Sequence, residues 1–274
     1  VCCGAAAGLA SCLRGLLLPG EEVIAFAPFF PEYRVFTEGA GGVLVPVPPD
    51  GKLLPDFAAF ERALTEKTKA VIVNTPNNPS GVVLPRESLQ RLGDILRHAQ
   101  CRFGHSIYLI SDEPYRELLY EGAPLWVPDY YENTLVCYSF SKSLSLPGER
   151  IGYVAVSPKA HESGDVFSAL AGAARACGYV NAPSFMQRVV EKCLGRTADI
   201  SLYKASRDLL YGGLTELGFD CAYPGGAFYL FVRSLEPDAK AFSEKAKKHE
   251  LLLVPSDDFG LGGYVRAAYC VPPE

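Results

Sequence analysis

The pattern that decides the fold lies in two stretches, IYLISDEPY at residues 107–115 and LVCYSFSK at residues 135–142. Each is a short apolar run that ends at polar side chains. Apolar runs without polar alternation are typical of strands buried on both faces, as in parallel sheets. The two stretches therefore predict strands whose polar residues follow at the carboxyl edge of one sheet, which is where open α/β folds bind ligands.

The same texture extends outward from these stretches. Amphipathic segments separate the apolar runs, and this alternation predicts an α/β fold with a largely parallel sheet. We expect helices at residues 5–18, 56–64 and 86–99, and strands at residues 23–26, 43–47, 70–73, 107–110, 135–138 and 151–156.

Beyond about residue 160 the pattern changes to longer helical stretches. It predicts helices at 196–217 and 239–249 and short strands at 227–232, 251–254 and 264–268. We interpret this part as a smaller α+β unit hinged on a long helix. The predicted domains are residues 1–195 and residues 196–274.

Composition excludes several classes of protein. Of 274 residues, 49% are hydrophobic and 21% charged, which is typical of globular proteins and not of disordered chains, collagens or coiled coils. The net charge of −5 provides no basic field for nucleic acid. No apolar stretch is long enough to span a membrane. The nine cysteines and four histidines show no metal-ligand spacing, so we expect no metal, reduced thiols and a cytoplasmic location.

Polar residues follow three successive predicted strands. They are the Asn-rich turn NTPNNPSG at 74–81, then Asp112 with Tyr115, then Ser139 and Lys142 with Arg150 beyond them. Each has an ordinary interpretation as a turn, as the N-cap of a following helix, or as a solvated lysine. Their joint occurrence at one sheet edge favours a functional site.

Pyridoxal phosphate chemistry requires this set of groups. A lysine forms a Schiff base with the cofactor aldehyde, and an ionised Asp keeps the pyridine nitrogen protonated. A dianionic phosphate is held by an arginine, by hydroxyl groups and by the free N–H groups of a helix start. The small residues of the segment that begins at Gly4 would allow close approach of backbone to the phosphate.

These residues resemble the fold-type I pyridoxal-phosphate enzymes, specifically the class I/II aminotransferases. The resemblance implies a three-layer large domain with a mostly parallel sheet (the aspartate-aminotransferase fold) and a smaller α+β C-terminal domain. It covers nearly the whole chain through GAAAGL (4–9), LLPGEEVIAFAPFFPEY (17–33), NTPNNPSG (74–81), SDEPY (111–115), YSFSKSLSLPGERIGY (138–153), PGGAFY (224–229) and YVRAAY (264–269).

The resemblance also implies roles for single residues. Lys142 forms the Schiff base and moves the proton, Asp112 pairs with the pyridine nitrogen, and Arg266 binds the substrate α-carboxylate. The remaining cofactor-binding residues that it implies are Asn78 and Tyr115 at the ring oxygen, Phe30 stacked on the ring, and Ser139, Arg150 and the Ala5 and Ala6 backbone at the phosphate.

The expected function is transfer of an amino group between an amino acid and a 2-oxo acid, with 2-oxoglutarate as the expected acceptor, in a homodimer. The family has further segments before the phosphate loop and after the last arginine strand, so we expect a fragment that binds cofactor poorly or turns over slowly, and a full-length parent that is active. A β-lyase, an aminocyclopropane-carboxylate-synthase-like enzyme and the effector domain of a transcription regulator remain alternatives. A dinucleotide enzyme and a serine hydrolase are disfavoured, because G-x-G-x-x-G and G-x-S-x-G are absent. The sequence leaves the amino donor open.

Overall fold

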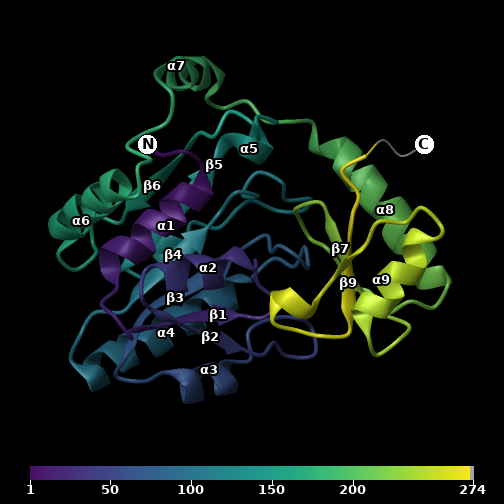
Figure 1. Cartoon of the computed structure of the whole chain (residues 1–274), viewed down its shortest axis with the longest axis horizontal. Coiled ribbons are helices and arrows are strands. Elements are labelled where there is room, and N and C mark those ends of the chain that lie inside the picture. Colours follow the sequence, from purple (N-terminus) through teal and green to yellow (C-terminus); the bar gives the residue numbers. More distant parts are fainter. Residues whose placement is uncertain (272–274) are drawn as a thin grey trace.

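The computed structural model describes residues 1–271, which form two units, each built on its own sheet (Figure 1). The larger sheet has the strand order β2-β1-β3-β4-β5-β6, and every pair in it is parallel except β5 with β6. The prediction of a largely parallel α/β sheet is thus confirmed. Its strands are β1 (Glu22–Phe26), β2 (Val43–Val47), β3 (Thr68–Asn74), β4 (Tyr108–Asp112), β5 (Thr134–Ser139) and β6 (Gly152–Val156).

The expected apolar runs stop short of the observed strand ends. Asn74, Asp112 and Ser139 are the last residues of β3, β4 and β5. Asn74 pairs in register with Asp112, and Asp112 with Cys137. Backbone pairing does not depend on side-chain polarity, so the strands continue through these residues. Their side chains are therefore fixed by the sheet itself and not by flexible loops.

Helices cover both faces of the larger sheet. On one face α1 (Ala5–Leu16), α2 (Glu32–Gly39) and α6 (Ser163–Ala176) pack over side chains that include Val23, Ala25 and Ile72. On the other, α3 (Phe57–Ala63) and α4 (Arg86–Phe103) pack over Ile24, Val71 and Val73. This strict alternation gives three layers, as expected from strands buried on both faces.

In the larger unit, two helix ends differ from the sequence-based bounds by two residues or more. Helix α1 ends two residues early because Leu17 is extended ahead of Pro19. Helix α4 runs on to Phe103 and ends at Gly104, whose φ of 74° is the left-handed conformation that stops helices. The helix that the alternative N-cap role of Asp112 would require does not form. Turns follow instead, so Asp112 is not an N-cap.

The second unit lies on the right in Figure 1 and contains α8 (Ile200–Glu216), α9 (Ala239–Lys247) and a small antiparallel sheet, β7-β9-β8. Its strands are β7 (Tyr229–Arg233), β8 (Val254–Pro255) and β9 (Tyr264–Ala268). Strand β8 is short because residues 251 and 252, expected in it, are exposed leucines. The smaller α+β unit is present, whereas a boundary at residue 195 stays a prediction and residues 272–274 lie outside the described part.

The remaining helices are α5 (Phe140–Ser143) and α7 (Ser184–Cys193), with 3-10 turns η1 (Val127–Asp129) and η2 (Asp257–Phe259). Helix α7 packs through Met186 and Val190 against Ile151, the residue before β6. Within residues 1–271 no helix has the length and apolarity to cross a bilayer.

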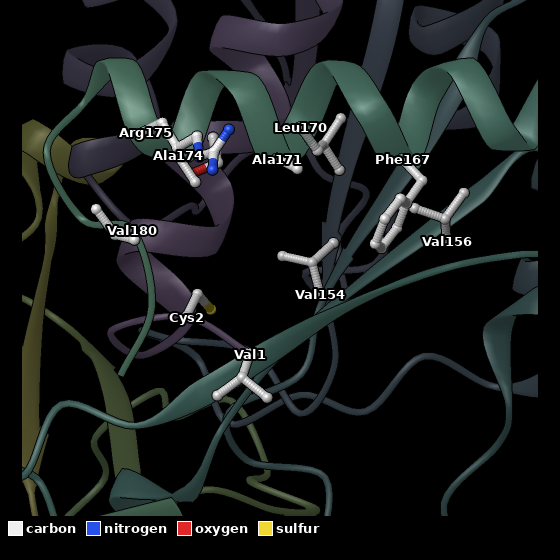
Figure 2. Close-up of a pocket in the computed structure, with 11 residues that line it drawn as sticks. Val1, Cys2, Val154, Val156, Phe167, Leu170, Ala171, Ala174, Arg175 and Val180 are labelled. Atoms are coloured by element: carbon white, nitrogen blue, oxygen red, sulfur yellow. The ribbon is translucent and has the colours of Figure 1, made fainter. Parts of the chain in front are cut away.

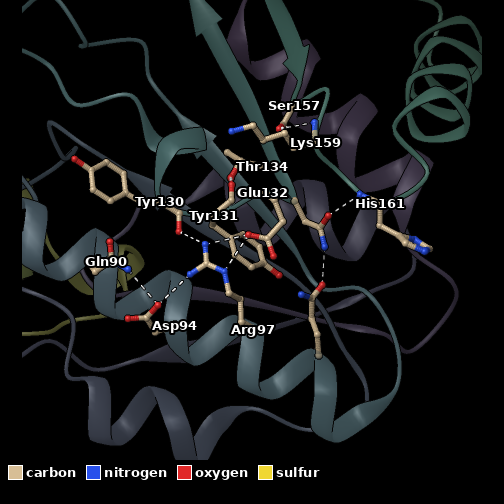
Figure 3. A network of polar contacts seen from close by, with 12 residues as sticks. Gln90, Asp94, Arg97, Tyr130, Tyr131, Glu132, Thr134, Ser157, Lys159 and His161 are labelled. Carbon is tan, nitrogen blue, oxygen red and sulfur yellow. Dashed lines mark hydrogen bonds and ion pairs between the residues drawn. The ribbon is translucent and has the colours of Figure 1, made fainter.

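The amino ends of the strands are held by a polar network (Figure 3). Arg97 of α4 donates through Nη1 to Asp94, through Nε to Glu132 at 3.0 Å and through Nη2 to the carbonyl of Tyr130 at 2.7 Å. The side chain of Asn133 adds a bond to Gln100 at 2.6 Å. These contacts fix the loop before β5 on α4, at the sheet edge opposite the polar strand ends, and none involves a predicted site residue.

Candidate active site

Asp112 ends β4 as a buried carboxylate with a single hydrogen-bonded oxygen. The hydroxyl of Tyr33, on α2, donates to Oδ2 at 2.6 Å, and no described residue contacts Oδ1 by a hydrogen bond. Burial raises the pKa of Asp112 to about 7, against the lowering effect of the Tyr33 bond. Asn74 donates from Nδ2 to the Asp112 carbonyl at 2.8 Å and so fixes the backbone. Oδ1 of Asp112 can therefore accept a hydrogen bond from a ligand.

Lys142 lies one turn beyond the end of β5, in the short helix α5. Burial lowers the pKa of its amine, and the positive charges of Arg150 and Arg266 lower it further against an opposing effect of Cys270. Its Nζ sits 5.2 Å from the centroid of the Phe228 ring. A half-buried lysine with a lowered pKa has more of its amine in the neutral, nucleophilic form.

The start of α1, Ser139 and Arg150 meet at Gly4. A Cβ built on Gly4 would lie 2.9 Å from Arg150 Nη2 and 3.8 Å from Ser139 Oγ, and the φ of Gly4 is +84°. No side chain caps α1, so the first N–H groups of the helix, those of Ala5 and Ala6 among them, face this space without a capping partner. A helix start, a hydroxyl and a guanidinium together favour an anion.

Arg266 reaches across from the small sheet to the larger one. Its Nη1 donates to Asn78 Oδ1 at 2.8 Å, and its guanidinium stacks over Tyr229 at 4.5 Å and Phe259 at 5.2 Å. Nε is buried and has no hydrogen-bond partner among the described residues. The arginine is thus held in place with donor capacity left for a ligand.

Tyr115 and Tyr229 form the second bridge between the two units. Their hydroxyls lie 3.1 Å apart, and both rings are buried. Tyr115 also meets Phe228 edge to face at 5.6 Å. Because Tyr229 also lies under Arg266 and Phe228 lies under Lys142, these contacts join the strand ends of both sheets into one site.

Phe30 contacts the same region through Tyr33. It is half buried and packs edge-on against Tyr33 at 5.8 Å. The structure therefore gathers the predicted residues at the carboxyl edge of the larger sheet, with Arg266 supplied by the smaller one. They are Ala5, Ala6, Phe30, Asn78, Asp112, Tyr115, Ser139, Lys142, Arg150 and Arg266.

Sequence reasoning missed three residues of this site: Tyr33, Asn74 and Tyr229. Tyr33 and Tyr229 sit inside quoted motifs, PFFPEY and PGGAFY, but nothing in their spacing shows that each hydroxyl meets a site residue. Asn74 opens the motif NTPNNPSG and accepts a hydrogen bond from the Asn78 N–H at 2.7 Å, which shapes the turn. These side chains act on other side chains, and only the fold reveals such contacts.

Figure 2 shows a separate, mostly apolar cavity of about 320 Å³ between α6, β6 and the start of the chain. Val154, Phe167 and Leu170 contribute to its walls, and no predicted site residue lines it. Among residues 1–271, no cluster of three His, Cys, Asp or Glu side chains has the arrangement of a metal site.

Comparison with known proteins supports the expectation drawn from these motifs. The family model described as aminotransferase class I and II matches residues 1–274. The aspartate/prephenate aminotransferase of Thermus thermophilus is 34% identical over 99% of this chain and 70% of its own length. A probable kynurenine–oxoglutarate transaminase of Saccharomyces cerevisiae is 41% identical over 55% of this chain and 36% of its own length.

The fold agrees with the sequence matches. A solved aminotransferase from Eubacterium rectale superposes with a TM-score of 0.96 at 50% identity, covering 99% of this chain and 69% of that one. A mutant of Thermus thermophilus aspartate aminotransferase superposes with a TM-score of 0.89 at 32% identity, covering 99% and 75%. The expected aspartate-aminotransferase fold is confirmed.

Proposed function

The chain belongs to the class I and II aminotransferases, enzymes that use pyridoxal 5′-phosphate, and we propose that Lys142, Asp112 and Arg266 carry its reaction. Its substrates are amino acids and 2-oxo acids. The observation that carries the assignment of residues is the bare, buried Oδ1 of Asp112 in the same site as the half-buried Lys142.

The described residues fit the cofactor at both ends. Oδ1 of Asp112 is a buried acceptor without a partner, as a protonated ring nitrogen requires. The space at Gly4, which a Cβ would fill, is bordered by Arg150 and Ser139 and suits a phosphate. When bound, pyridoxal 5′-phosphate takes up the amino group at its aldehyde carbon and serves as an electron sink.

We assign the remaining cofactor contacts to residues around these two ends. Ser139, Arg150 and the N–H groups of Ala5 and Ala6 hold the phosphate. Asn78 and Tyr115 donate to the ring oxygen, and the hydrogen bond from Arg266 to Oδ1 of Asn78 leaves Nδ2 as the donor of that amide. Phe30 covers the ring face.

Lys142 would hold the cofactor covalently through its amine, and it would move a proton once the amino group of the substrate has displaced that amine. Its lowered pKa favours the neutral amine, which is the form that attacks an aldehyde and the form that accepts a proton from the substrate α-carbon. Asp112 holds the positive charge of the ring nitrogen. Arg266 binds the substrate carboxylate and so sets the α-carbon against Lys142.

We propose 2-oxoglutarate as the amino acceptor in a ping-pong cycle. The name of the yeast relative includes oxoglutarate, and covalent shuttling implies that one product leaves before the second substrate binds. We further propose a cytoplasmic homodimer. Support for pairing comes from the exposed apolar side chains of α6 and α7, Phe167 and Phe185. Sedimentation equilibrium tests the homodimer, for which we expect twice the mass of one chain.

The test of the assignment is Lys142→Ala with added pyridoxal 5′-phosphate. Borohydride reduction followed by peptide mass spectrometry should attach the cofactor at residue 142 in the wild type and nowhere in the variant. Transamination should fall by at least ~10²-fold, because a positioned acid–base group contributes about 10²–10⁴-fold. The matched control is Lys159→Ala, an exposed lysine after β6.

The half-reaction decides between transferase and lyase. Glutamate alone should yield one equivalent of 2-oxoglutarate and the aminated cofactor. Release of pyruvate and ammonia from a sulfur amino acid would favour the lyase alternative, and labelling of a lysine other than Lys142 would overturn the site.

A further inference from the structure

Tyr33 is the one side chain in the described residues that donates a hydrogen bond to the Asp112 carboxylate. It comes from α2, outside the strand-end motifs, and its ring is 1% exposed. The Oη–Oδ2 distance of 2.6 Å is typical of a strong bond to a charged acceptor. Tyr33 therefore determines which carboxylate oxygen is satisfied within the protein and which is left for a ligand.

The ring of Tyr33 is fixed by its neighbours. It packs against Phe29 at 6.4 Å and edge-on against Phe30 at 5.8 Å, and the centre of this cluster is inaccessible to water. Asp112 is equally fixed, since it is paired in β4 and its carbonyl accepts from Asn74. Because both Tyr33 and Asp112 are held in place, Oδ1 of Asp112 has a fixed orientation.

The charges around Asp112 do not favour its ionised form. On its own segment, Glu113 raises the pKa of Asp112, although Glu113 is itself paired with Arg116. Tyr115 and the Cys137 thiol, which faces it from β5, are neutral neighbours whose own pKa values are raised. Among residues 1–271 no lysine or arginine forms an ion pair with Asp112. Tyr33 alone among these contacts opposes burial.

We propose that Tyr33 is a positioning residue for the cofactor: its hydroxyl favours the charged form of Asp112 and points Oδ1 at the ring nitrogen. The proposal rests on the proposed pairing of Asp112 with that nitrogen. Without the hydroxyl, Asp112 holds a proton over a wider pH range and is free to rotate. A protonated or rotated carboxyl cannot stabilise the positive ring, so cofactor affinity suffers while carboxylate binding at Arg266 does not.

The test compares Tyr33→Phe with Tyr131→Phe. Tyr131 is also a buried tyrosine with one hydrogen bond, from its hydroxyl to the carbonyl of Ile107 at 2.7 Å, but it lies at the amino end of β4. Dissociation constants for pyridoxal 5′-phosphate are measured by equilibrium dialysis from pH 5 to pH 9, together with kcat and KM for glutamate.

Tyr33→Phe should weaken cofactor binding roughly tenfold or more at pH 7, since bonds to charged groups are the strong ones. The limb of the affinity profile that belongs to Asp112 should move up by about one pH unit. The kcat should fall with little change in KM, and Tyr131→Phe should change neither. Wild-type affinity and pH profile in Tyr33→Phe would overturn the proposal.

A second variant keeps the test decisive if Tyr33→Phe folds badly. Replacing Tyr33 with 3-fluorotyrosine retains the ring and makes the hydroxyl a stronger donor, so the same limb should move to lower pH. An unmoved limb would show that Tyr33 only packs α2. Failure of the proposed function is distinguishable, because then the wild type itself would bind no cofactor at Lys142.

Discussion

Arg266 shows how a single side chain is prepared for its ligand before the ligand arrives. Stacking on Tyr229 and Phe259 fixes the plane of its guanidinium, and Asn78 takes up only one of its donors. The buried Nε has no partner among the described residues, which is costly unless a ligand supplies one. A bidentate carboxylate matches the remaining donors in number and geometry.

We therefore expect Arg266→Gln to raise the KM for the amino acid by roughly 10- to 100-fold, because hydrogen bonds to charged groups contribute about 1.5–3 kcal/mol. Steady-state kinetics with glutamate measures this change. Arg233→Gln is the control, since Arg233 is an exposed arginine on the neighbouring strand, paired with Asp220. Equal losses in the two variants would mean that charge on the small sheet, and not a contact at Arg266, matters.

At the scale of elements, the start of α1 is the proposed anion-binding end of the site. Gly4 is the N-cap of α1 and adopts a φ of +84°. Because it has no side chain, nothing caps the helix and no Cβ fills the space beside Arg150 and Ser139. Gly4→Ala would place a methyl group in that room and add backbone strain. We expect the dissociation constant for pyridoxal 5′-phosphate to rise by about tenfold or more, the loss of one charge-assisted contact.

Gly20→Ala is the control that separates the effect of the added methyl group in Gly4→Ala from the effect of backbone strain. Gly20 has the same φ of +84°, but a Cβ there meets nothing within 4 Å. Both variants should lower the melting temperature, because alanine at a φ of +84° is strained, and the loss should be larger for Gly4→Ala, whose ψ of 172° lies in a region almost confined to glycine. Only Gly4→Ala should weaken cofactor binding. A similar loss of affinity in Gly20→Ala would place the effect in stability and not at the phosphate site.

The strands of the larger sheet could be predicted from the sequence because they bury apolar runs, whereas helix α2 could not. The strands that end in Asn74, Asp112 and Ser139 were expected within two residues, because their apolar runs are fully buried. Helix α2 was not expected: only Tyr33 and Thr37 of its eight residues are buried, too few to give a period. The contact of Tyr33 with Asp112 joins residues 79 positions apart and has no local signal.

At the scale of the whole molecule, the larger sheet buries an acid that the folded chain alone does not stabilise. Burial raises the pKa of Asp112 from 3.8 to about 7, so the cofactor-free chain holds a proton there that the unfolded chain releases above about pH 4. The charged form of Asp112 thus gains a partner only when a ligand is bound. Ionising the buried Asp112 should therefore lower the free energy of unfolding. Comparison with a variant that carries a neutral isostere at this position separates the effect of Asp112 from the effects of the other carboxylates.

Asp112→Asn is that isostere, and its expected effect has a definite sign. A raised folded-state pKa gives stability that is present below the unfolded pKa and lost as pH rises through the folded one, here between about pH 4 and pH 7. Urea unfolding of the cofactor-free proteins should therefore show the wild type losing up to about 4 kcal/mol relative to Asp112→Asn across that range. A difference between the two proteins that stays constant from pH 4 to pH 8 would contradict a buried, protonated Asp112. With saturating pyridoxal 5′-phosphate the wild type should be the more stable of the two proteins above pH 7, because its charged carboxylate then pairs with the ring nitrogen and it binds the cofactor more tightly than Asp112→Asn does.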